Sequence, residues 1–371
     1  MSSININPLS AGYGQYPHAS KKTFLVSGML VTVFGLEELS SQVTEVSCLW
    51  LLHPRLNTQE GMEPIASVAI ADWNTRRKEG RVDAAQRNKG LIAVSLDQRN
   101  HGTRELDKLA NDAWRSGNPR HVQDMFSIYN GTARDVSLLL DFLPCYIFPE
   151  AERTITQNIV LGISLGGHAA WHCILHEPRI RSAVIIISCP DYINLMSDRA
   201  RLSKLKSWTE SSPPGINFVG SRDFPNSLVE SVKRWDPAAL LLSQLESGPI
   251  NDGPLRAEHL PEPTEEEKEK IRPILKRCLA GKRILNLSGG ADKLVPYRSG
   301  KPFFSWFGKA IGPGGWYKDG AISFEDIIFD GVGHEASPKM IEQAVRFISE
   351  TLASGDDRGG AKVSRVRESR M

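Results

Sequence analysis

The chain has 371 residues, of which 40% are hydrophobic, 24% charged and 8% aromatic, and its formal net charge is +2. This composition is that of an ordinary globular protein, and the length suits one large domain that carries an insertion. The small net charge argues against a nucleic-acid binder, which would need a concentrated basic face. The five cysteines are scattered without a C-x-x-C pair or a metal-ligand spacing, which favours a reducing compartment. We predict neither a bound metal nor a cofactor.

Residues 1–21 are polar and contain glycine and serine, and we expect an irregular N-terminal arm. The apolar stretch from Phe24 to Leu36 follows two lysines, as the core of a signal peptide would. It is interrupted at Ser27-Gly28 and Gly35 and is rich in β-branched residues, so we interpret it as a β-hairpin. Because it is shorter than the roughly 20 apolar residues that a membrane helix requires, we predict no membrane span.

From residue 22 onward, short β-rich runs alternate with runs of helical periodicity, which is typical of a doubly wound α/β sheet. The β-rich runs are almost continuously apolar, as expected for parallel strands covered on both faces. We predict eight strands, over Thr23–Val26, Leu30–Phe34, Val46–Leu52, Leu91–Leu96, Asn158–Ile163, Ser182–Ile187, Arg283–Leu287 and Ile322–Phe329.

Helices are expected between and after these strands. Apolar residues recur at intervals of three and four over each candidate, as on the buried face of an amphipathic helix. The four predicted helices cover Pro64–Arg77, Thr132–Leu143, Gly166–His176 and Pro338–Leu352.

An interruption separates the sixth and seventh strands. Residues 189–281 hold ten of the 22 prolines, and their helical pieces are short, which indicates an irregular lid over the carboxyl edge of the sheet. Thr264-Glu265-Glu266-Glu267 reads as a capping box, and Pro273 should kink or limit the helix that follows. We therefore predict a core of residues 22–190 and 282–353, a lid of residues 191–281 and a disordered tail of residues 354–371.

The strongest local motif is Gly162-Ile163-Ser164-Leu165-Gly166, which follows a predicted strand and opens a predicted helix. This context is typical of a nucleophile elbow, in which a serine sits on a sharp, strained turn. The flanking glycines supply room for that turn. A simple tight turn is the alternative interpretation, and Ser164 is our candidate nucleophile.

A serine nucleophile requires a base. Gly331-Val332-Gly333-His334-Glu335 lies between the last strand and the last helix, which places His334 at the carboxyl edge of the sheet. His168 and His172 are on the elbow helix and are expected to pack or to face solvent. His53 and His101 come too early for the Ser–acid–His chain order. His334 is therefore the candidate base.

The base requires an orienting acid, and Asp292 follows the seventh predicted strand in Ser288-Gly289-Gly290-Ala291-Asp292-Lys293-Leu294-Val295-Pro296. A carboxylate there would hold the tautomer of His334 and stabilise its protonated form. Asp191, after the sixth strand, and Asp330, after the eighth, are rival candidates.

These motifs occur in the order in which they occur in the α/β-hydrolase superfamily, and the chain resembles that superfamily over roughly residues 22–352 without the lid. Asp97-Gln98-Arg99-Asn100-His101-Gly102 is similar to the family's Asp-x-Arg-x-His-Gly turn. The resemblance implies an oxyanion hole made by the amide of Leu165 and by one amide of the loop after the third strand. That loop reads His53-Pro54-Arg55-Leu56, and because proline has no N–H the second amide belongs to Arg55 or Leu56. The Arg55 side chain could alternatively hold a substrate carboxylate.

The segment from Asp112 to Phe126 is expected to be a long loop that opens at the same edge of the sheet. Trp114, Met125 and Phe126 are candidates to line an acyl pocket there. Simple apolar anchoring of the loop is the alternative.

The last three residues, Ser369-Arg370-Met371, resemble the Ser-Lys-Leu peroxisomal address. They predict a peroxisomal protein that meets the import receptor, with the cytoplasm as the alternative location. With this tail, the long lid and the Asp97–Gly102 turn, the chain resembles the fungal peroxisomal hydrolases of host-selective toxin biosynthesis. Peroxisomal residence would favour an acyl-CoA or a secondary-metabolite ester as substrate.

The expected function is hydrolysis of a carboxylic ester or thioester through an acyl-enzyme on Ser164. An acyltransferase with the same triad and a non-catalytic ligand-binding protein with this fold are the alternatives.

Overall fold

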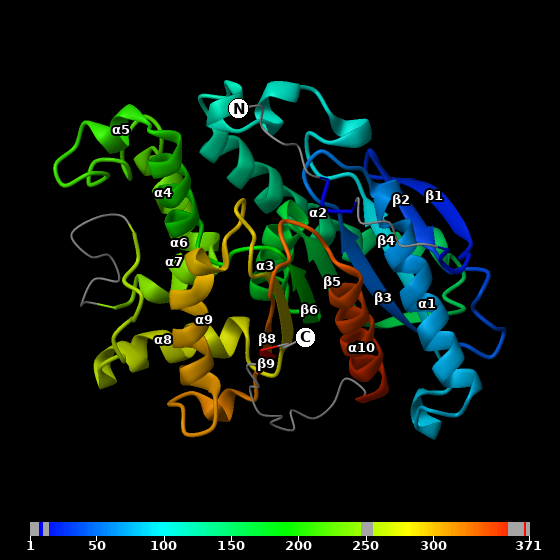
Figure 1. Cartoon of the computed structure of the whole chain (residues 1–371). Helices are drawn as coiled ribbons and strands as arrows, with labels where there is room; N and C mark the ends of the chain where they lie inside the picture. The colour runs from blue at the N-terminus through cyan, green and yellow to red at the C-terminus, as the bar shows by residue number, and fades with distance from the viewer. Residues whose placement is uncertain (1–6, 10–14, 246–254, 355–366, 369–371) are drawn as a thin grey trace.

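The computed structural model describes residues 7–9, 15–245, 255–354 and 367–368. One sheet forms its centre, with strands in the order β1-β2-β4-β3-β5-β6-β7-β8-β9 (Figure 1). β2 pairs antiparallel with β1 and β4, whereas every other neighbouring pair is parallel. The strands are β1 Lys21–Val26, β2 Met29–Phe34, β3 Glu45–Leu52, β4 Lys89–Leu96, β5 Thr154–Ile163, β6 Ile180–Ile186, β7 Arg283–Gly289, β8 Ser323–Phe329 and β9 Arg367–Glu368.

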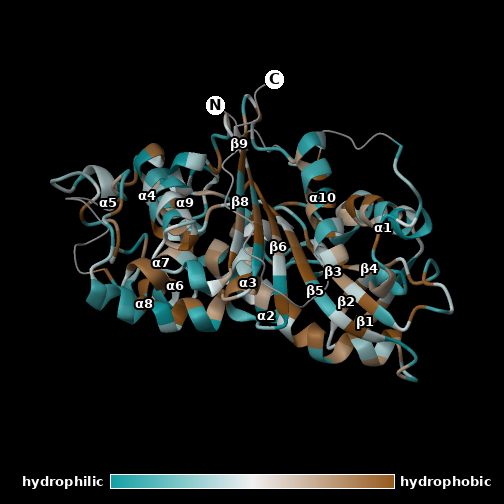
Figure 2. Ribbon diagram, turned by 90° about the horizontal axis from the view of Figure 1, so that it is seen from below, coloured by the Kyte–Doolittle hydropathy of each residue, from teal (hydrophilic) through white to brown (hydrophobic). Residues whose placement is uncertain are grey.

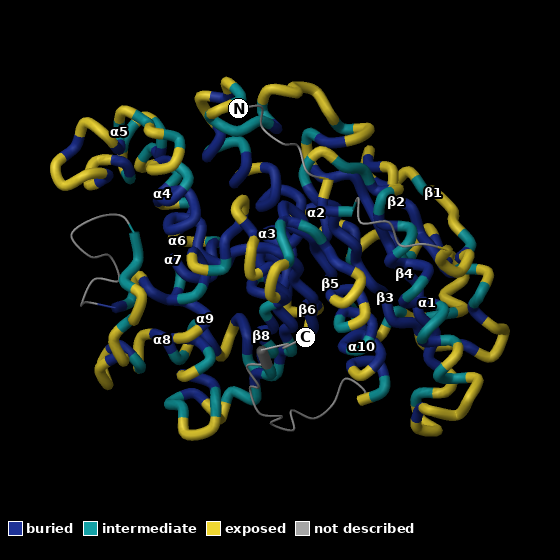
Figure 3. Tube along the Cα trace, viewed as in Figure 1, coloured by how far each residue is buried: buried dark blue, intermediate teal, exposed yellow. Residues whose placement is uncertain are grey.

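The mostly parallel, doubly wound sheet predicted from the apolar runs is confirmed. All eight predicted strands are present, and the two-residue β9 adds a short partner to β8. Every residue of β4 is buried, as its continuous apolar run predicts, whereas the edge strand β1 is mostly exposed (Figure 3).

Helices cover both faces of the sheet (Figure 2). α1 (Glu63–Lys78) and α10 (Pro338–Ser354) lie on one face, and α2 (His121–Ile147) and α3 (Leu165–His176) lie on the other. Each face has its own apolar cluster, because near-continuous apolar strands present side chains to both sides. All four predicted helices are present.

α2 begins earlier than predicted, at His121 rather than Thr132. The expected loop from Asp112 to Phe126 is therefore wrong in its last part, and Met125 and Phe126 are helical. The buried spacing continues upstream through Val122 and Phe126, but polar Asn130 and Thr132 interrupt it in the sequence. Both polar residues are nevertheless buried, since each finds a hydrogen-bond partner.

The predicted lid, residues 191–281, is more helical than expected. Its helices gather at one side of the sheet (Figure 1), and the last of them continues through Pro273 to Cys278, so Pro273 does not limit this helix. The helices are α4 Tyr192–Ser203, α5 Lys206–Thr209, α6 Asn226–Trp235, α7 Pro237–Leu242 and α8 Glu265–Cys278. The capping box at Thr264 is confirmed, because its side chain and that of Glu267 each accept the other residue's backbone N–H. An unpredicted helix, α9 (Tyr297–Ile311), follows β7.

The described part of the N-terminal arm, residues 7–9 and 15–20, has no helix or strand and packs on the core. Pro8 accepts a hydrogen bond from the amide of Ala336, N to O 2.9 Å, in the segment that leads into α10. Most of the tail predicted to be disordered, including Ser369–Met371, lies outside the described residues. No helix in the described ranges has both the length and the apolarity that a bilayer crossing requires.

Candidate active site

Ser164 occupies the turn between β5 and α3. Its backbone has φ 54° and ψ −112°, a left-handed conformation that is costly for a residue with a Cβ. Two backbone hydrogen bonds hold it there, from Ser164 N to Ile186 O at 2.9 Å and from His168 N to Ser164 O at 3.0 Å. The strand–turn–helix geometry predicted for the Gly162–Gly166 motif is present.

The glycines of this motif are required by close backbone contacts. A Cβ on Gly162 would lie 2.0 Å from the carbonyl oxygen of Gly166, and a Cβ on Gly166 would lie 2.0 Å from that of Leu52. The first turn of α3 thus packs directly against the end of β3 and the loop that follows it.

The tertiary structure brings Ser164, His334 and Asp292 together. The Oγ of Ser164 lies 2.9 Å from Nε2 of His334, and Nδ1 of His334 lies 2.8 Å from Oδ2 of Asp292. A carboxylate can only accept, so Nδ1 carries the proton and Nε2 is free to accept the serine hydroxyl proton. This is the hydrogen-bond pattern of a Ser–His–Asp triad.

The acid of this triad is held ionised. Oδ1 of Asp292 accepts the amides of Leu294 and Val295 at 2.8 and 2.9 Å. Burial raises the pKa of Asp292, but the hydrogen bond and charge of His334 and these two amides lower it further, so the pKa lies below its ordinary value.

The two rival acids have other environments. Asp191 accepts the amide of Asn194 as the N-cap of α4 and forms a buried ion pair with Arg256, Nε to Oδ2 2.6 Å. Asp330 is exposed. His334 therefore has Asp292 as its carboxylate partner.

His168 and His172 are buried in α3, next to the elbow. Nδ1 of His168 contacts the carbonyl oxygen of Ser164 at 2.9 Å, and Nδ1 of His172 contacts the amide of Asn130 at 3.0 Å. Burial, the largest cause, lowers the pKa of His168 to about 3. This imidazole is therefore neutral at neutral pH. Both rings pack in the core, one of the two placements expected for them.

The loop after β3 lies beside the elbow, since the Cβ of an alanine at position 166 would also meet the carbonyl of His53 at 2.8 Å. Leu56 has φ 60°, which turns the loop sharply. Within the described residues, the backbone amides of Leu165, Arg55 and Leu56 donate no hydrogen bond to the protein. These three amides therefore have no backbone acceptor in the described part of the chain.

The Asp97–Gly102 turn supports this loop. Oδ1 of Asp97 accepts the amide of Gln59 at 2.8 Å, and the amide of Gln98 donates to Nε2 of His53 at 2.9 Å. A Cβ on Gly102 would meet the Asp97 carboxylate at 2.4 Å, which explains the glycine. Burial lowers the pKa of His53 to about 4, consistent with a neutral ring that accepts this amide.

The three candidates for an acyl pocket have different surroundings. The ring of Trp114 lies 5.1 Å from that of His121, and the sulfur of Met125 lies 3.3 Å from Nη1 of Arg199. Phe126 packs within an aromatic cluster in the core, whose members are Tyr129, His172 and Tyr192. The sequence reasoning missed Arg199, which looks like an ordinary solvated charge in Asp198-Arg199-Ala200-Arg201.

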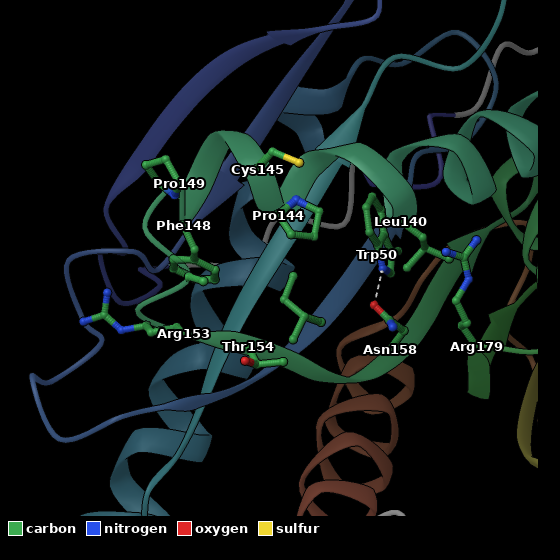
Figure 4. Close-up of a pocket in the computed structure, with 12 residues that line it drawn as sticks. Trp50, Leu140, Pro144, Cys145, Phe148, Pro149, Arg153, Thr154, Asn158 and Arg179 are labelled. Atoms are coloured by element: carbon green, nitrogen blue, oxygen red, sulfur yellow. Dashed lines mark hydrogen bonds between the residues drawn. The ribbon is translucent and has the colours of Figure 1, made fainter.

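A separate cavity of about 480 Å³ lies between the end of α2 and the beginning of β5 (Figure 4). Its lining includes Trp50, Pro144, Phe148 and Asn158 but none of the triad or acyl-pocket candidates. Because Ser164 follows the opposite end of β5, this cavity is not part of the candidate active site.

No protein-family model matches the chain, and no curated protein matches it in sequence. Among solved structures the chain is similar to TT1662 from Thermus thermophilus, with a TM-score of 0.50, 15% identity and coverage of 90% of this chain and 98% of that chain. The chain has the α/β-hydrolase fold. Two further similar structures are an S-formylglutathione hydrolase from Agrobacterium tumefaciens (TM-score 0.47, 14% identity, 90% and 95% coverage) and the Pyrococcus furiosus esterase Pf2001 (0.42, 11%, 92% and 92%).

Proposed function

We propose that this protein is a serine hydrolase that cleaves a carboxylic ester or thioester. The observation that carries the proposal is the continuous hydrogen-bonded chain Ser164–His334–Asp292 on a strained elbow at the carboxyl edge of the sheet. A serine needs both a base within hydrogen-bond reach and an acid that orients the base in order to act as a nucleophile.

In the proposed reaction, Oγ of Ser164 attacks the acyl carbon while Nε2 of His334 takes the hydroxyl proton. The amide of Leu165 and that of Arg55 or Leu56 donate to the oxyanion of the tetrahedral intermediate. His334 then returns the proton to the departing alcohol or thiol, which leaves an acyl-enzyme. Water, activated by the same imidazole, attacks the acyl-enzyme and releases the carboxylic acid and free Ser164.

The proposed acyl pocket is lined by Trp114, Met125 and Phe126, and the lid of residues 191–281 selects the substrate. Trp114 contacts His121 at the start of α2, and Met125 contacts Arg199 of α4. Transfer of the acyl group to an alcohol or amine instead of water is the alternative outcome for the same acyl-enzyme, and rates measured with added acceptors separate the two.

The test is labelling by a fluorophosphonate probe together with a panel of ester, acyl-CoA and peptide substrates. We expect wild-type protein to be labelled and to release acid from esters or thioesters, and Ser164→Ala to lose both properties. Wild-type protein that is neither labelled nor active on the panel would identify a non-catalytic ligand-binding protein instead.

Peroxisomal location and a role in secondary-metabolite biosynthesis remain predictions. The first rests on Ser369–Met371, outside the described residues, and the second on the resemblance to fungal peroxisomal hydrolases of toxin biosynthesis.

A further inference from the structure

Two arginines near the candidate triad form no ion pair among the described residues. Among the described residues, no carboxylate oxygen lies within 4.0 Å of a side-chain nitrogen of Arg55 or Arg199, although both side chains are only partly exposed. Neighbouring arginines are paired: Arg201, two residues along α4, lies 2.6 Å from Asp198, and Arg99 lies 2.8 Å from Asp135. The carboxylates whose charges act on them, Asp112 on Arg55 and Asp292 on Arg199, lie beyond that distance, and Asp292 is already hydrogen-bonded to His334. A partly buried guanidinium that no carboxylate contacts can bind an anion from outside the chain.

Arg55 belongs to the loop that also carries the proposed oxyanion amides. Its Nη1 donates one hydrogen bond, to the carbonyl oxygen of Asn111 at 2.9 Å. A guanidinium has five N–H donors, and the other four of Arg55 donate to no acceptor in the described residues.

Arg199 belongs to α4 and contacts the loop that carries Asp292. Its Nη2 donates to the carbonyl oxygen of Leu294 at 2.9 Å, and the amide of Leu294 donates to Oδ1 of Asp292. Nη1 of Arg199 contacts the sulfur of Met125 and, at 3.4 Å, Nε2 of His121. Leu294 therefore connects the two side chains: its carbonyl oxygen accepts from Arg199, and its amide donates to the triad acid Asp292.

His121 connects the two arginines. Its Nδ1 lies 2.9 Å from the carbonyl oxygen of Asp112, which directly follows the Asn111 that Arg55 contacts. A carbonyl can only accept, so Nδ1 is the donor and Nε2 accepts from Arg199. Burial, followed by the charges of Arg199 and Arg55, lowers the pKa of His121 well below its ordinary value, so both guanidinium charges act on one neutral ring.

We propose that Arg55 and Arg199 bind an anionic group of the substrate, a carboxylate or a phosphate. This inference rests on the proposed function and narrows its substrate class to esters or thioesters that carry a negative charge. The planar donors of a guanidinium match the oxygens of both anions. The carboxylate would come from the hemi-ester of a dicarboxylic acid, and the phosphate from the coenzyme part of an acyl-CoA.

The test compares kcat/KM for matched charged and neutral substrates. Monomethyl adipate is paired with methyl 6-methylheptanoate, and butyryl-CoA is paired with the butyryl thioester of N-acetylcysteamine, which lacks the phosphates. We expect wild-type protein to prefer the charged member of one pair by about 10- to 100-fold, as for a charge-assisted hydrogen bond to a buried anion. The pair that shows the preference identifies the source of the anion.

The variants Arg199→Met and Arg55→Met should bring this ratio close to one, and Arg199→Lys should keep part of it. Arg201→Met, on the same helix but paired with Asp198, is the matched control and should leave the ratio unchanged. If Arg199→Met lowers the charged and neutral rates by the same factor, the guanidinium only positions the Asp292 loop and the inference is overturned. If a variant does not fold, the wild-type protein still tests the inference. Its ratio of kcat/KM for the charged and the neutral substrate should fall as the concentration of sodium chloride is raised, and an unchanged ratio would overturn the inference.

Fluorophosphonate labelling separates failure of this inference from failure of the proposed function. A wild-type protein that is labelled at Ser164 but prefers neither charged substrate is a hydrolase without the anion site. If Ser164 is not labelled, calorimetric titration with adipate and with coenzyme A still tests the site, because binding that is lost in Arg199→Met supports it and no binding overturns it.

Discussion

The carboxylate of Asp292 accepts three hydrogen bonds, one from His334 and two from backbone amides. The carboxylate therefore stays ionised and holds the proton of His334 on Nδ1. An asparagine in its place could present its NH₂ group to the imidazole and favour the wrong tautomer.

We predict that Asp292→Asn lowers kcat by on the order of 10³-fold or more with little change in stability. The measurement is single-turnover hydrolysis of the best ester from the substrate panel. Asp330→Asn, at the exposed rival acid, is the control and should keep wild-type kcat. Equal loss in both variants would contradict the assignment of the acid.

Buried histidines give the protein a stability that depends on pH. Burial lowers the pKa of His168 to about 3 and that of His53 to about 4, against an ordinary value of about 6.5. Between these values and pH 6.5 the unfolded chain binds more protons than the folded one. The stability that the neutral, buried His168 and His53 allow is therefore fully present above pH 6.5. It is lost as the pH falls from about 6.5 towards their folded-state pKa values of about 3 and about 4.

We predict that the free energy of unfolding, measured by urea titration, falls between pH 7 and pH 5. Replacing His168 with leucine should make this fall shallower by about 2 kcal/mol, since one pH unit of pKa difference corresponds to about 1.4 kcal/mol. His259→Gln, which replaces an exposed histidine outside the core, is the control for the loss of one histidine. An unchanged slope in His168→Leu would show that His168 does not contribute.

At the scale of elements, the elbow depends on how closely β5, α3 and β3 approach one another. The carbonyl oxygen of Leu52 occupies the space that a side chain at position 166 would need. Backbone atoms cannot rotate away as a flexible side chain can, so α3 itself would have to move.

We predict that Gly166→Ala lowers both kcat and the free energy of unfolding, because moving α3 displaces Ser164 from His334. Gly308→Ala is the matched control: it lies within α9 with nothing within 4 Å of the added Cβ. Alanine there should stabilise the protein by about 0.5–1 kcal/mol through helix propensity. Urea titration and ester hydrolysis measure both effects, and full activity in Gly166→Ala would contradict the packing argument.

At the scale of the whole molecule, a buried ion pair joins the first residue of the predicted lid, Asp191, to Arg256 in the second half of the lid. Arg256 and Asp191 are 3% and 1% exposed, and Asp191 begins α4 just after β6. Asp236, the N-cap of α7, lies close by, and burial followed by the charge of Asp191 raises its pKa well above the ordinary value. Arg256 is therefore the cation that allows two carboxylates to be buried together.

We predict that Arg256→Met destabilises the protein by about 3–5 kcal/mol, because it leaves buried acids without a counter-ion. Lys301→Met, which removes an exposed pair with Glu258, should cause no measurable change. Thermal unfolding of both variants at neutral pH is the measurement. A small effect of Arg256→Met would show that the acids are satisfied in another way.

The location of the protein is also a property of the whole chain. We predict that a fluorescent protein fused to the N-terminus enters peroxisomes and that deletion of Ser369–Met371 leaves the fusion in the cytosol. Microscopy with a peroxisomal marker is the measurement, and an identical distribution of both fusions would refute the targeting prediction.

The parallel sheet and the triad could be predicted from the sequence because their signals are local. Continuous apolar runs reveal strands buried on both faces, and the motifs around Ser164, Asp292 and His334 each follow such a run. Once the strands are ordered, the loops at their carboxyl ends must meet at one edge. The residues alone therefore determined the fold class and the candidate triad.

Only the tertiary structure showed the helical lid, the early start of α2 and the unpaired arginines. Polar residues such as Asn130 and Thr132 interrupt the helical pattern, yet they are buried because distant or local acceptors satisfy them. Likewise, Arg55 and Arg199 form no ion pair among the described residues, whereas Arg201, on the same helix as Arg199, does. That property depends on which residues from distant parts of the chain become neighbours, and no local pattern in the sequence records it.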